Sequence, residues 1–193
     1  PPAGPPPSRH SEMFGTDLLR TRAATTPDRT AVELVDSDQT WSYRDLDKAV
    51  DELAASLDAL EADDDTRLAA ALPTGFSFVC SIHAAVRLGW ELTPLNTRLA
   101  AGELADRLDK LAPDVVLCAR ETEKILAEAQ ARQAAPETDG PRRYTVDDPA
   151  EADTATPPTA DSPAETDPHD PTDTALVLFT SGTTGESAVG GVA

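Results

Sequence analysis

The chain has 193 residues, with 35 acidic and 16 basic side chains and a formal net charge of -19 at pH 7. A charge this negative argues against nucleic acid or an anionic membrane as a binding partner. No apolar run approaches the length needed for a transmembrane helix.

Cysteine and lysine are both scarce in the chain. The only cysteines, Cys80 and Cys118, imply no disulfide framework, so we expect a cytoplasmic location. The only lysines are Lys48, Lys110 and Lys124, and aspartate is more frequent than glutamate. Short carboxylates keep a surface hydrated at high salt, where screening weakens their mutual repulsion. We therefore favour a haloarchaeal-type protein over a generic acidic one.

The N-terminal part divides into a proline-rich start and a folded region. Residues 1–15 are rich in proline, and we expect them to be disordered. Residues 16–146 are predicted to fold. They begin with a short helix and two strands that can pair across a turn: Asp17–Ala24, Thr30–Val35 and Gln39–Ser42.

Strands and helices then alternate along the chain. Ser42 and Asp45 resemble a capping box, and the helix after them has an apolar face that extends to Leu60. The next predicted elements are, in order, Arg67–Leu72, Thr74–Leu88, Glu91–Leu95, Leu99–Leu111, Asp114–Cys118, Thr122–Gln133 and Tyr144–Val146. This alternation predicts βα units and hence an α/β fold with a mainly parallel sheet flanked by helices.

Residues 147–174 differ in composition from the rest of the chain. They hold nine acidic residues and six prolines, without any lysine or arginine. Such a segment buries too little apolar surface to fold, so we predict a disordered acidic insert. The last segment, residues 175–193, starts with an apolar strand, Ala175–Phe179.

A polar, glycine-rich loop follows this last strand directly. Glycines let the backbone curl so that its N–H groups point at a phosphate, and hydroxyl side chains add further donors. A polar turn leaving a strand is the alternative that composition alone favours. The loop is not a Walker A motif, because no lysine follows its last glycine. The candidate phosphate-binding residues are Thr180, Ser181, Gly182, Thr183, Thr184 and Gly185.

The segment Leu178–Gly185, LFTSGTTG, resembles the signature loop of the AMP-binding family of acyl-adenylate-forming acyl-CoA synthetases and ligases. Upstream segments resemble that family in the same order: Arg22–Glu33, Thr40–Leu57 and Arg87–Leu117. The likeness spans Asp17 to Gly185 apart from the acidic insert. The sequence PLNTRL, Pro94–Leu99, is similar to the corresponding segment of the o-succinylbenzoate–CoA ligases of menaquinone synthesis. Medium-chain fatty acid–CoA ligases have a similar segment.

The resemblance implies an ATP-dependent acid–CoA ligase with two half-reactions. A carboxylate attacks the α-phosphate of ATP to give an acyl-adenylate and pyrophosphate, and the thiol of CoA then displaces AMP. The implied cofactors are ATP and Mg2+, with CoA as co-substrate. Residues Thr180–Gly185 would hold the pyrophosphate that is released in the first half-reaction.

The sequence departs from the family pattern after the loop. Ser187 stands where the family has proline, and Ala188 stands where it has lysine. By resemblance, the adenine pocket, the ribose-binding aspartate and the C-terminal catalytic lysine belong to later segments. We therefore expect the 193 residues to be an N-terminal fragment of the ligase fold, inactive alone, and assign no catalytic residue.

Two other functional classes remain open. One is a non-catalytic remnant or weak nucleotide-binding module, and the other is an acidic interaction module that depends on residues 147–174. Cys80 and His83 lie three residues apart on a predicted helix and could touch one metal ion. No further ligands lie nearby in the sequence, so we favour core packing for this pair and predict no metal site.

Overall fold

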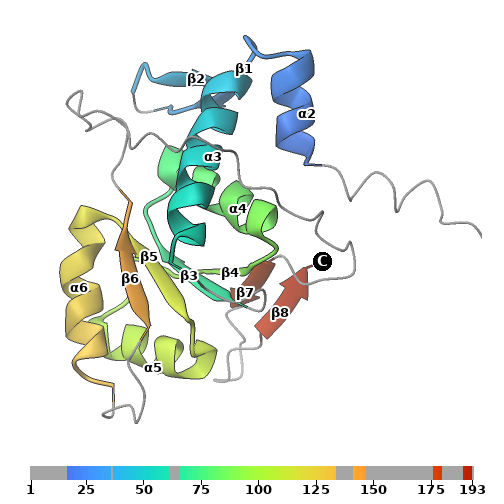
Figure 1. Cartoon of the computed structure of the whole chain (residues 1–193). Coiled ribbons are helices and arrows are strands. Elements are labelled where there is room, and N and C mark those ends of the chain that lie inside the picture. The colour runs from blue at the N-terminus through green and yellow to red at the C-terminus, as the bar shows by residue number, and fades with distance from the viewer. Residues whose placement is uncertain are drawn as a thin grey trace, which may run out of the picture.

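The computed structural model of the chain describes residues 17–35, 37–60, 66–133, 141–146, 176–179 and 189–192. A six-stranded sheet carries helices on both faces, and a separate two-stranded hairpin lies beyond the helices on one face (Figure 1). This arrangement confirms the predicted α/β class. The predicted disordered segments, residues 1–15 and 147–174, lie outside the described residues.

The first elements pack together on one side of the molecule. They are α2 (Leu18–Thr25), β1 (Thr30–Glu33), β2 (Thr40–Ser42) and α3 (Tyr43–Asp58), with β1 and β2 antiparallel. The predicted capping box at the start of α3 is confirmed. The Ser42 hydroxyl accepts from the Asp45 N–H at 3.2 Å, and the Asp45 carboxylate accepts from the Ser42 N–H at 2.9 Å. These bonds satisfy donors that the first turn of a helix leaves without partners.

The main sheet has the strand order β6-β5-β3-β4-β7-β8. Its strands are parallel except for β8, which runs antiparallel to β7. Their bounds are β3 Arg67–Ala71, β4 Glu91–Pro94, β5 Val115–Cys118, β6 Arg142–Thr145, β7 Leu176–Phe179 and β8 Val189–Val192. The mainly parallel sheet was expected from the sequence, whereas β8 was not predicted.

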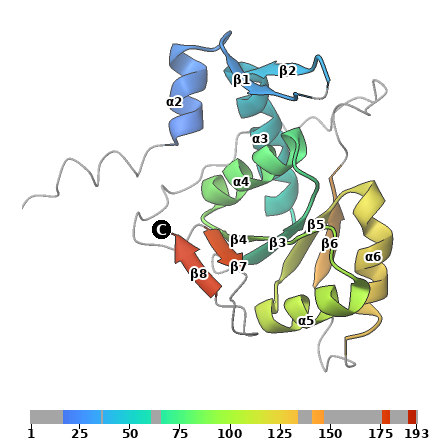
Figure 2. The same cartoon turned by 180° about the vertical axis from the view of Figure 1, so that it is seen from behind.

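Helices cover the two faces of the sheet separately. α3 and α4 (Phe76–Leu88) lie on one face, and α5 (Ala101–Leu111) and α6 (Arg120–Gln130) lie on the other (Figures 1 and 2). Alternate residues of β3 pack against the helices on opposite faces of the sheet, because successive side chains of a strand point to opposite faces. Leu68 packs with α3 and α4, and Ala69 packs with α5 and α6.

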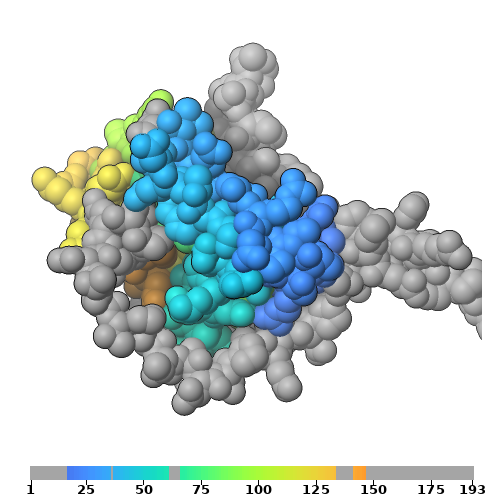
Figure 3. Space-filling view, turned by 90° about the horizontal axis from the view of Figure 1, so that it is seen from above, coloured from blue at the N-terminus to red at the C-terminus, as the bar shows by residue number. Residues whose placement is uncertain are grey.

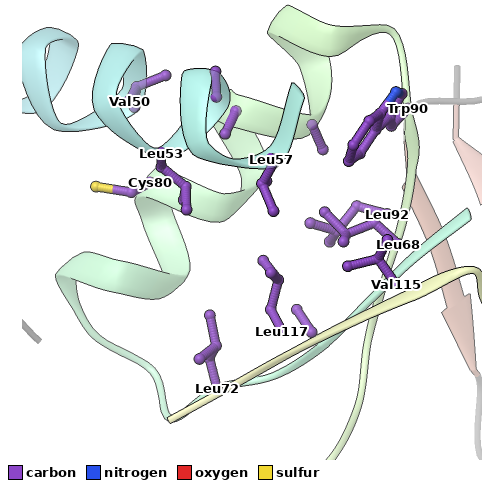
Figure 4. Close-up of a cluster of buried hydrophobic side chains, with 14 of the residues drawn as sticks. Val50, Leu53, Leu57, Leu68, Leu72, Cys80, Trp90, Leu92, Val115 and Leu117 are labelled. Atoms are coloured by element: carbon purple, nitrogen blue, oxygen red, sulfur yellow. The ribbon is translucent and has the colours of Figure 1, made fainter. Parts of the chain in front are cut away.

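The larger core fills the space between the sheet and the helix pair α3–α4. Figure 4 shows Val50, Leu53 and Leu57 of α3 facing the strand residues Leu68 and Leu117 across this space. Cys80 and Trp90 belong to the same buried cluster. The prediction that Cys80 packs in the core is therefore confirmed. Among the helices described, none is both long and apolar enough to cross a bilayer.

Some element bounds differ from the prediction for local reasons. α4 begins at Phe76, two residues later than expected, and Gly75 is its N-cap. α6 begins at Arg120 rather than Thr122, since the Thr122 hydroxyl accepts from the Ala119 N–H at 3.0 Å and so caps the helix from inside its first turn. α5 ends at Leu111, as Pro113 predicted, and Ala112 has a left-handed backbone with φ 42°.

Candidate functional site

The predicted phosphate-binding residues Thr180–Gly185 lie outside the described residues, but the strands on both sides of them are described. β7 ends at Phe179 and β8 begins at Val189, and these two residues pair with each other in the antiparallel register. Residues 180–188 therefore connect the two facing ends of one hairpin. Phe179, the residue directly before the candidate loop, is the last residue of β7.

The carboxyl end of β4 lies beside that of β7. The two strands are parallel, with Leu92 opposite Leu176. Counting three residues along this register makes Leu95 level with Phe179, the last described residue before the candidate loop. In open α/β sheets, ligands bind in the crevice outside the carboxyl ends of the strands. The carboxyl ends of β4 and β7 therefore lie on the side of the sheet where this fold class binds ligands.

The turn after β4 is held by three hydrogen bonds, two between backbone groups and one from a backbone N–H to a side chain. The Leu95 N–H donates to the Ala70 carbonyl at 2.8 Å, which fixes the exit of β4 against β3. The Asn96 side-chain oxygen accepts from the Arg98 N–H at 3.0 Å, and the Asn96 carbonyl accepts from the Leu99 N–H at 3.3 Å. Asn96 and Arg98 are both exposed. The turn therefore presents an amide and a cation at the carboxyl edge of the sheet.

A second side chain fixes the neighbouring part of this edge. The Thr122 hydroxyl, which is buried, donates to the Ala71 carbonyl at 2.7 Å. It thereby joins the end of β3 to the first turn of α6. Among the described residues, no group of three or more His, Cys, Asp or Glu side chains is placed to hold a metal ion.

The strongest electrostatic cluster of the described residues lies away from this edge. Arg87 of α4 has a side chain only 2% exposed and meets three aspartates. Its Nη2 lies 2.6 Å from Asp17 Oδ2 and 2.8 Å from Asp47 Oδ1, and its Nη1 lies 2.5 Å from Asp51 Oδ1. Arg20 Nη2 also contacts Asp51 Oδ1, at 2.6 Å. We name Arg87, Asp17, Asp47, Asp51 and Arg20 the arginine cluster.

The arginine cluster joins three helices. Asp17 is the N-cap of α2, Asp47 and Asp51 belong to α3, and Arg87 belongs to α4. Figure 3 shows α2 lying against α3 on this side of the molecule. Burial raises the pKa of Asp17, but the Arg20 N–H and the Arg87 guanidinium together lower it more, so the pKa lies below its ordinary 3.8. The cluster joins helices and does not lie at the strand ends, so we expect it to stabilise the fold.

His83 lies one helical turn before Arg87. Burial lowers its pKa, the charge of Arg87 lowers it further, and Asp17 and Asp47 oppose the change, so the pKa stays below the ordinary 6.5. The unfolded chain therefore takes up this proton before the folded chain does. Stability from neutral His83 is fully present above pH 6.5 and decreases as the pH falls toward the folded pKa.

We expect His83→Gln to reduce the loss of stability between pH 7.5 and pH 5.5. Glutamine keeps a polar side chain but has no proton to take up in this range. Urea unfolding of both proteins at the two pH values measures the effect. Asp17 does not interfere, because its stabilising ionised form is lost only below pH 3.8. An unchanged pH dependence in the variant would show that His83 is not the titrating group.

The sequence alone did not single out Asn96, Arg98 or the arginine cluster. Arg98 lies inside the PLNTRL segment that carried the family resemblance, so that motif is the signal that could have found it. Asp17 and Arg87 are 70 residues apart in the chain, and no local pattern links them.

Comparisons with known proteins agree on one family. The family model described as "AMP-binding enzyme" matches residues 19–187. The long-chain-fatty-acid–CoA ligase FadD13 of Mycobacterium tuberculosis is 29% identical over 121 residues, which are 63% of this chain and 24% of that protein. The nonribosomal peptide synthetase asaC of Aspergillus flavus is 30% identical over 111 residues, 58% of this chain and 11% of that protein.

Solved structures share the fold and have 26% to 27% sequence identity with this chain. VinN in complex with 3-methylaspartate superposes with a TM-score of 0.72 and 27% identity, covering 91% of this chain and 46% of VinN. The o-succinylbenzoate coenzyme A synthetase MenE of Bacillus subtilis, in complex with AMP, has a TM-score of 0.67 and 26% identity, covering 89% of this chain and 40% of MenE. The chain thus spans less than half the length of these proteins.

Proposed function

Because the chain belongs to the AMP-binding enzyme family, we propose that it supplies the phosphate-binding part of an acid–CoA ligase that forms acyl-adenylates. The observation that supports this most is the place of the TSGTTG segment, which begins directly after Phe179 at the carboxyl end of β7. Backbone N–H groups of Gly182 and Gly185 and the hydroxyls of Thr183 and Thr184 are the proposed phosphate donors.

The proposed chemistry has two displacement steps. A substrate carboxylate oxygen attacks the α-phosphorus of ATP, and the bond to the bridging oxygen breaks to release pyrophosphate. The CoA sulfur then attacks the acyl carbon, and the bond to AMP breaks. In such reactions the protein mainly positions the groups and stabilises charge. Thr180–Gly185 is proposed to hold the phosphates that leave in the first step.

Magnesium is proposed to accompany ATP and share the charge of its phosphates. Within the part of the chain that the structure describes, no set of three metal-ligating side chains gathers. We therefore assign no residue to the ion and no step to it.

We propose o-succinylbenzoate as the acid, which would place the complete ligase in menaquinone synthesis. Support comes from the segment Pro94–Leu99 and from the 26% identity with Bacillus subtilis MenE. A long-chain fatty acid is the second candidate, since FadD13 is 29% identical over its matched residues. The composition further supports a cytoplasmic protein of a halophilic organism, with 35 acidic against 16 basic residues.

A weak nucleotide-binding module without catalysis is the second candidate function. The absence of a lysine at position 188, where the sequence has alanine, favours it. Both candidates predict ATP binding through the loop, and only the ligase predicts a reaction in a protein that has all the family segments.

The double variant Thr183→Ala, Thr184→Ala is expected to bind ATP at least about tenfold more weakly than the wild type. It loses two hydroxyl donors to charged oxygens, and such hydrogen bonds contribute about 1.5–3 kcal/mol each. Calorimetric titration with Mg-ATP measures the change. The matched control is Thr172→Ala, Thr174→Ala, just upstream of β7, which should bind like the wild type. Equal affinities for all three proteins would refute the loop assignment.

A further inference from the structure

The helix α2 contributes little apolar surface to the core. Of its eight residues, all of which the structure describes, only Leu19 is buried, and the neighbouring Leu18 is 59% exposed. Helix α3 buries five residues by comparison. α2 lies beside α3 and away from the six-stranded sheet (Figures 1 and 2). Because the stabilisation from apolar burial grows with the area removed from water, it holds α2 less firmly than it holds α3.

Charged side chains hold the N-terminal end of α2. Nε and Nη2 of Arg87 lie 2.8 and 2.6 Å from Oδ2 of Asp17, the N-cap of α2. Three residues later, Nη2 of Arg20 lies 2.6 Å from Oδ1 of Asp51 on α3. Because the Arg87 side chain is buried, water competes little for its contact with Asp17. The docking of this end of α2 therefore depends on Asp17 and Arg20.

The chain after α2 is fastened by different contacts. The Arg44 N–H donates to the Pro27 carbonyl at 3.1 Å, and the Tyr43 N–H donates to the Arg29 carbonyl at 3.0 Å. Both N–H groups belong to the first turn of α3, where a helix offers them no partner of its own. Thr26 lies between α2 and this fastened segment. Residues at the ends of elements are the usual pivots of hinge motions, so Thr26 is the point about which α2 can turn.

The joint between α3 and α4 does not depend on α2. Without Asp17, Arg87 keeps its contacts with Asp47 at 2.8 Å and with Asp51 at 2.5 Å. Both of these aspartates belong to α3. Two carboxylates leave the buried guanidinium compensated in charge. Undocking of α2 therefore breaks the contacts of α2 itself but leaves α3 and α4 joined.

We propose that α2 is a strap that opens as one unit about Thr26 while the rest of the fold stays closed. Its latch consists of two contacts, Asp17–Arg87 and Arg20–Asp51. Segments with few buried apolar contacts open at a lower free energy than the core of a domain. Opening exposes the buried leucine of α2 and removes one carboxylate from the arginine cluster. The strap is thus a conformational device that is closed mainly by charge.

Asp17→Ser is expected to raise the hydrogen-exchange rates of the amides of residues 22–26 at least about tenfold. Serine caps a helix about as well as aspartate but does not reach Arg87, so the variant keeps the cap and loses two charge-assisted hydrogen bonds. Native-state hydrogen exchange of the full chain measures the rates. The matched control is Asp28→Ser, because Asp28 pairs with Arg44 where both side chains are well exposed. It should change these rates little.

A variant of the core tests whether α2 opens by itself. Val116 of β5 is fully buried and packs with α5 and α6, on the face of the sheet opposite α3 and α4. Val116→Ala removes two buried methyl groups, so amides of β3 and β5 that exchange through global unfolding should exchange about tenfold faster. The amides of residues 22–26 should keep their wild-type rates, because an open strap leaves Val116 buried.

Two results would overturn the proposal. If Val116→Ala raises exchange in α2 as much as in β3, α2 opens only when the whole chain unfolds. If Asp17→Ser raises exchange in α2 no more than Asp28→Ser does, the contact between Asp17 and Arg87 is not the latch. Faster exchange of α2 in Asp17→Ser, together with unchanged exchange of α2 in Val116→Ala, supports both parts. Neither measurement involves a nucleotide, so the test is independent of the proposed function.

Discussion

Replacement of Arg87 by leucine is expected to lower the free energy of unfolding by about 3–5 kcal/mol, the usual cost of removing one partner from a buried charge cluster. Leucine keeps apolar bulk against α3 but leaves Asp17, Asp47 and Asp51 facing each other. All three carboxylates contact Arg87 at 2.5 to 2.8 Å. Their mutual repulsion and the loss of the hydrogen bonds would separate α2 and α4 from α3.

Urea unfolding followed by circular dichroism measures this change. The matched control is Arg44→Leu, because Arg44 pairs with Asp28 at 3.0 Å where the two side chains are 65% and 85% exposed. Exposed pairs contribute about 0–1 kcal/mol, so the control should lose little stability. Arg87→Lys should fall between the two, since it keeps one charge but not the fork of donors. Equal losses for Arg87→Leu and Arg44→Leu would mean that the arginine cluster does not stabilise the fold.

The polypeptide of residues 1–193 is expected to show no acid-dependent exchange of pyrophosphate into ATP. Its matched region covers 46% of VinN and 40% of MenE, so more than half of each of those chains has no counterpart in these residues. By resemblance, the missing parts include the adenine pocket and the catalytic lysine. Holding two reactants in register contributes about 7–11 kcal/mol in favourable cases, so its loss would reduce the rate at least about 10^5-fold.

Two variants make this result informative. Ala188→Lys restores the family residue after the loop, and we expect it to bind ATP more tightly without restoring exchange. A fusion of residues 1–193 to the remaining segments of a family member should restore exchange if the ligase assignment is right. Continued inactivity of a folded fusion would favour the weak nucleotide-binding module instead. Exchange above background by residues 1–193 alone would contradict the expectation directly.

Local patterns were sufficient to predict most of the fold. The Ser42–Asp45 pair predicted the start of α3, and Pro113 predicted the end of α5, because both act through the backbone of their own segment. The alternation of strands and helices predicted the parallel sheet. The strand order could not be predicted in this way. Nothing near Leu176 in the sequence indicates that β7 pairs with β4 and not with β6.

Residues that act through distant partners were the ones missed. In the sequence, Arg87 is a polar position on a mainly apolar helix. Its contact with Asp17 is formed only in the folded chain. β8 was missed because Val189–Val192 contains two glycines, which disfavour strands, and its pairing with β7 outweighs that preference. In the sequence alone, Arg98 is one position of the segment Pro94–Leu99, and only the fold places it after the carboxyl end of β4. The position of Arg98 relative to β7 depends on the pairing of Leu92 with Leu176, and these two residues are more than 80 positions apart in the chain.

We propose that a nucleotide binds by its phosphates at the carboxyl ends of β4 and β7. The most direct measurement is a two-dimensional NMR titration of the 15N-labelled chain with Mg-ATP, followed through the assigned backbone amides. We predict that the largest shift changes fall on residues 180–185 and on the turn Asn96–Arg98, with little change along β6 (Arg142–Thr145) at the far edge of the sheet. Changes centred on β6 or on the α2–α3 side, or none at millimolar ATP, would contradict it.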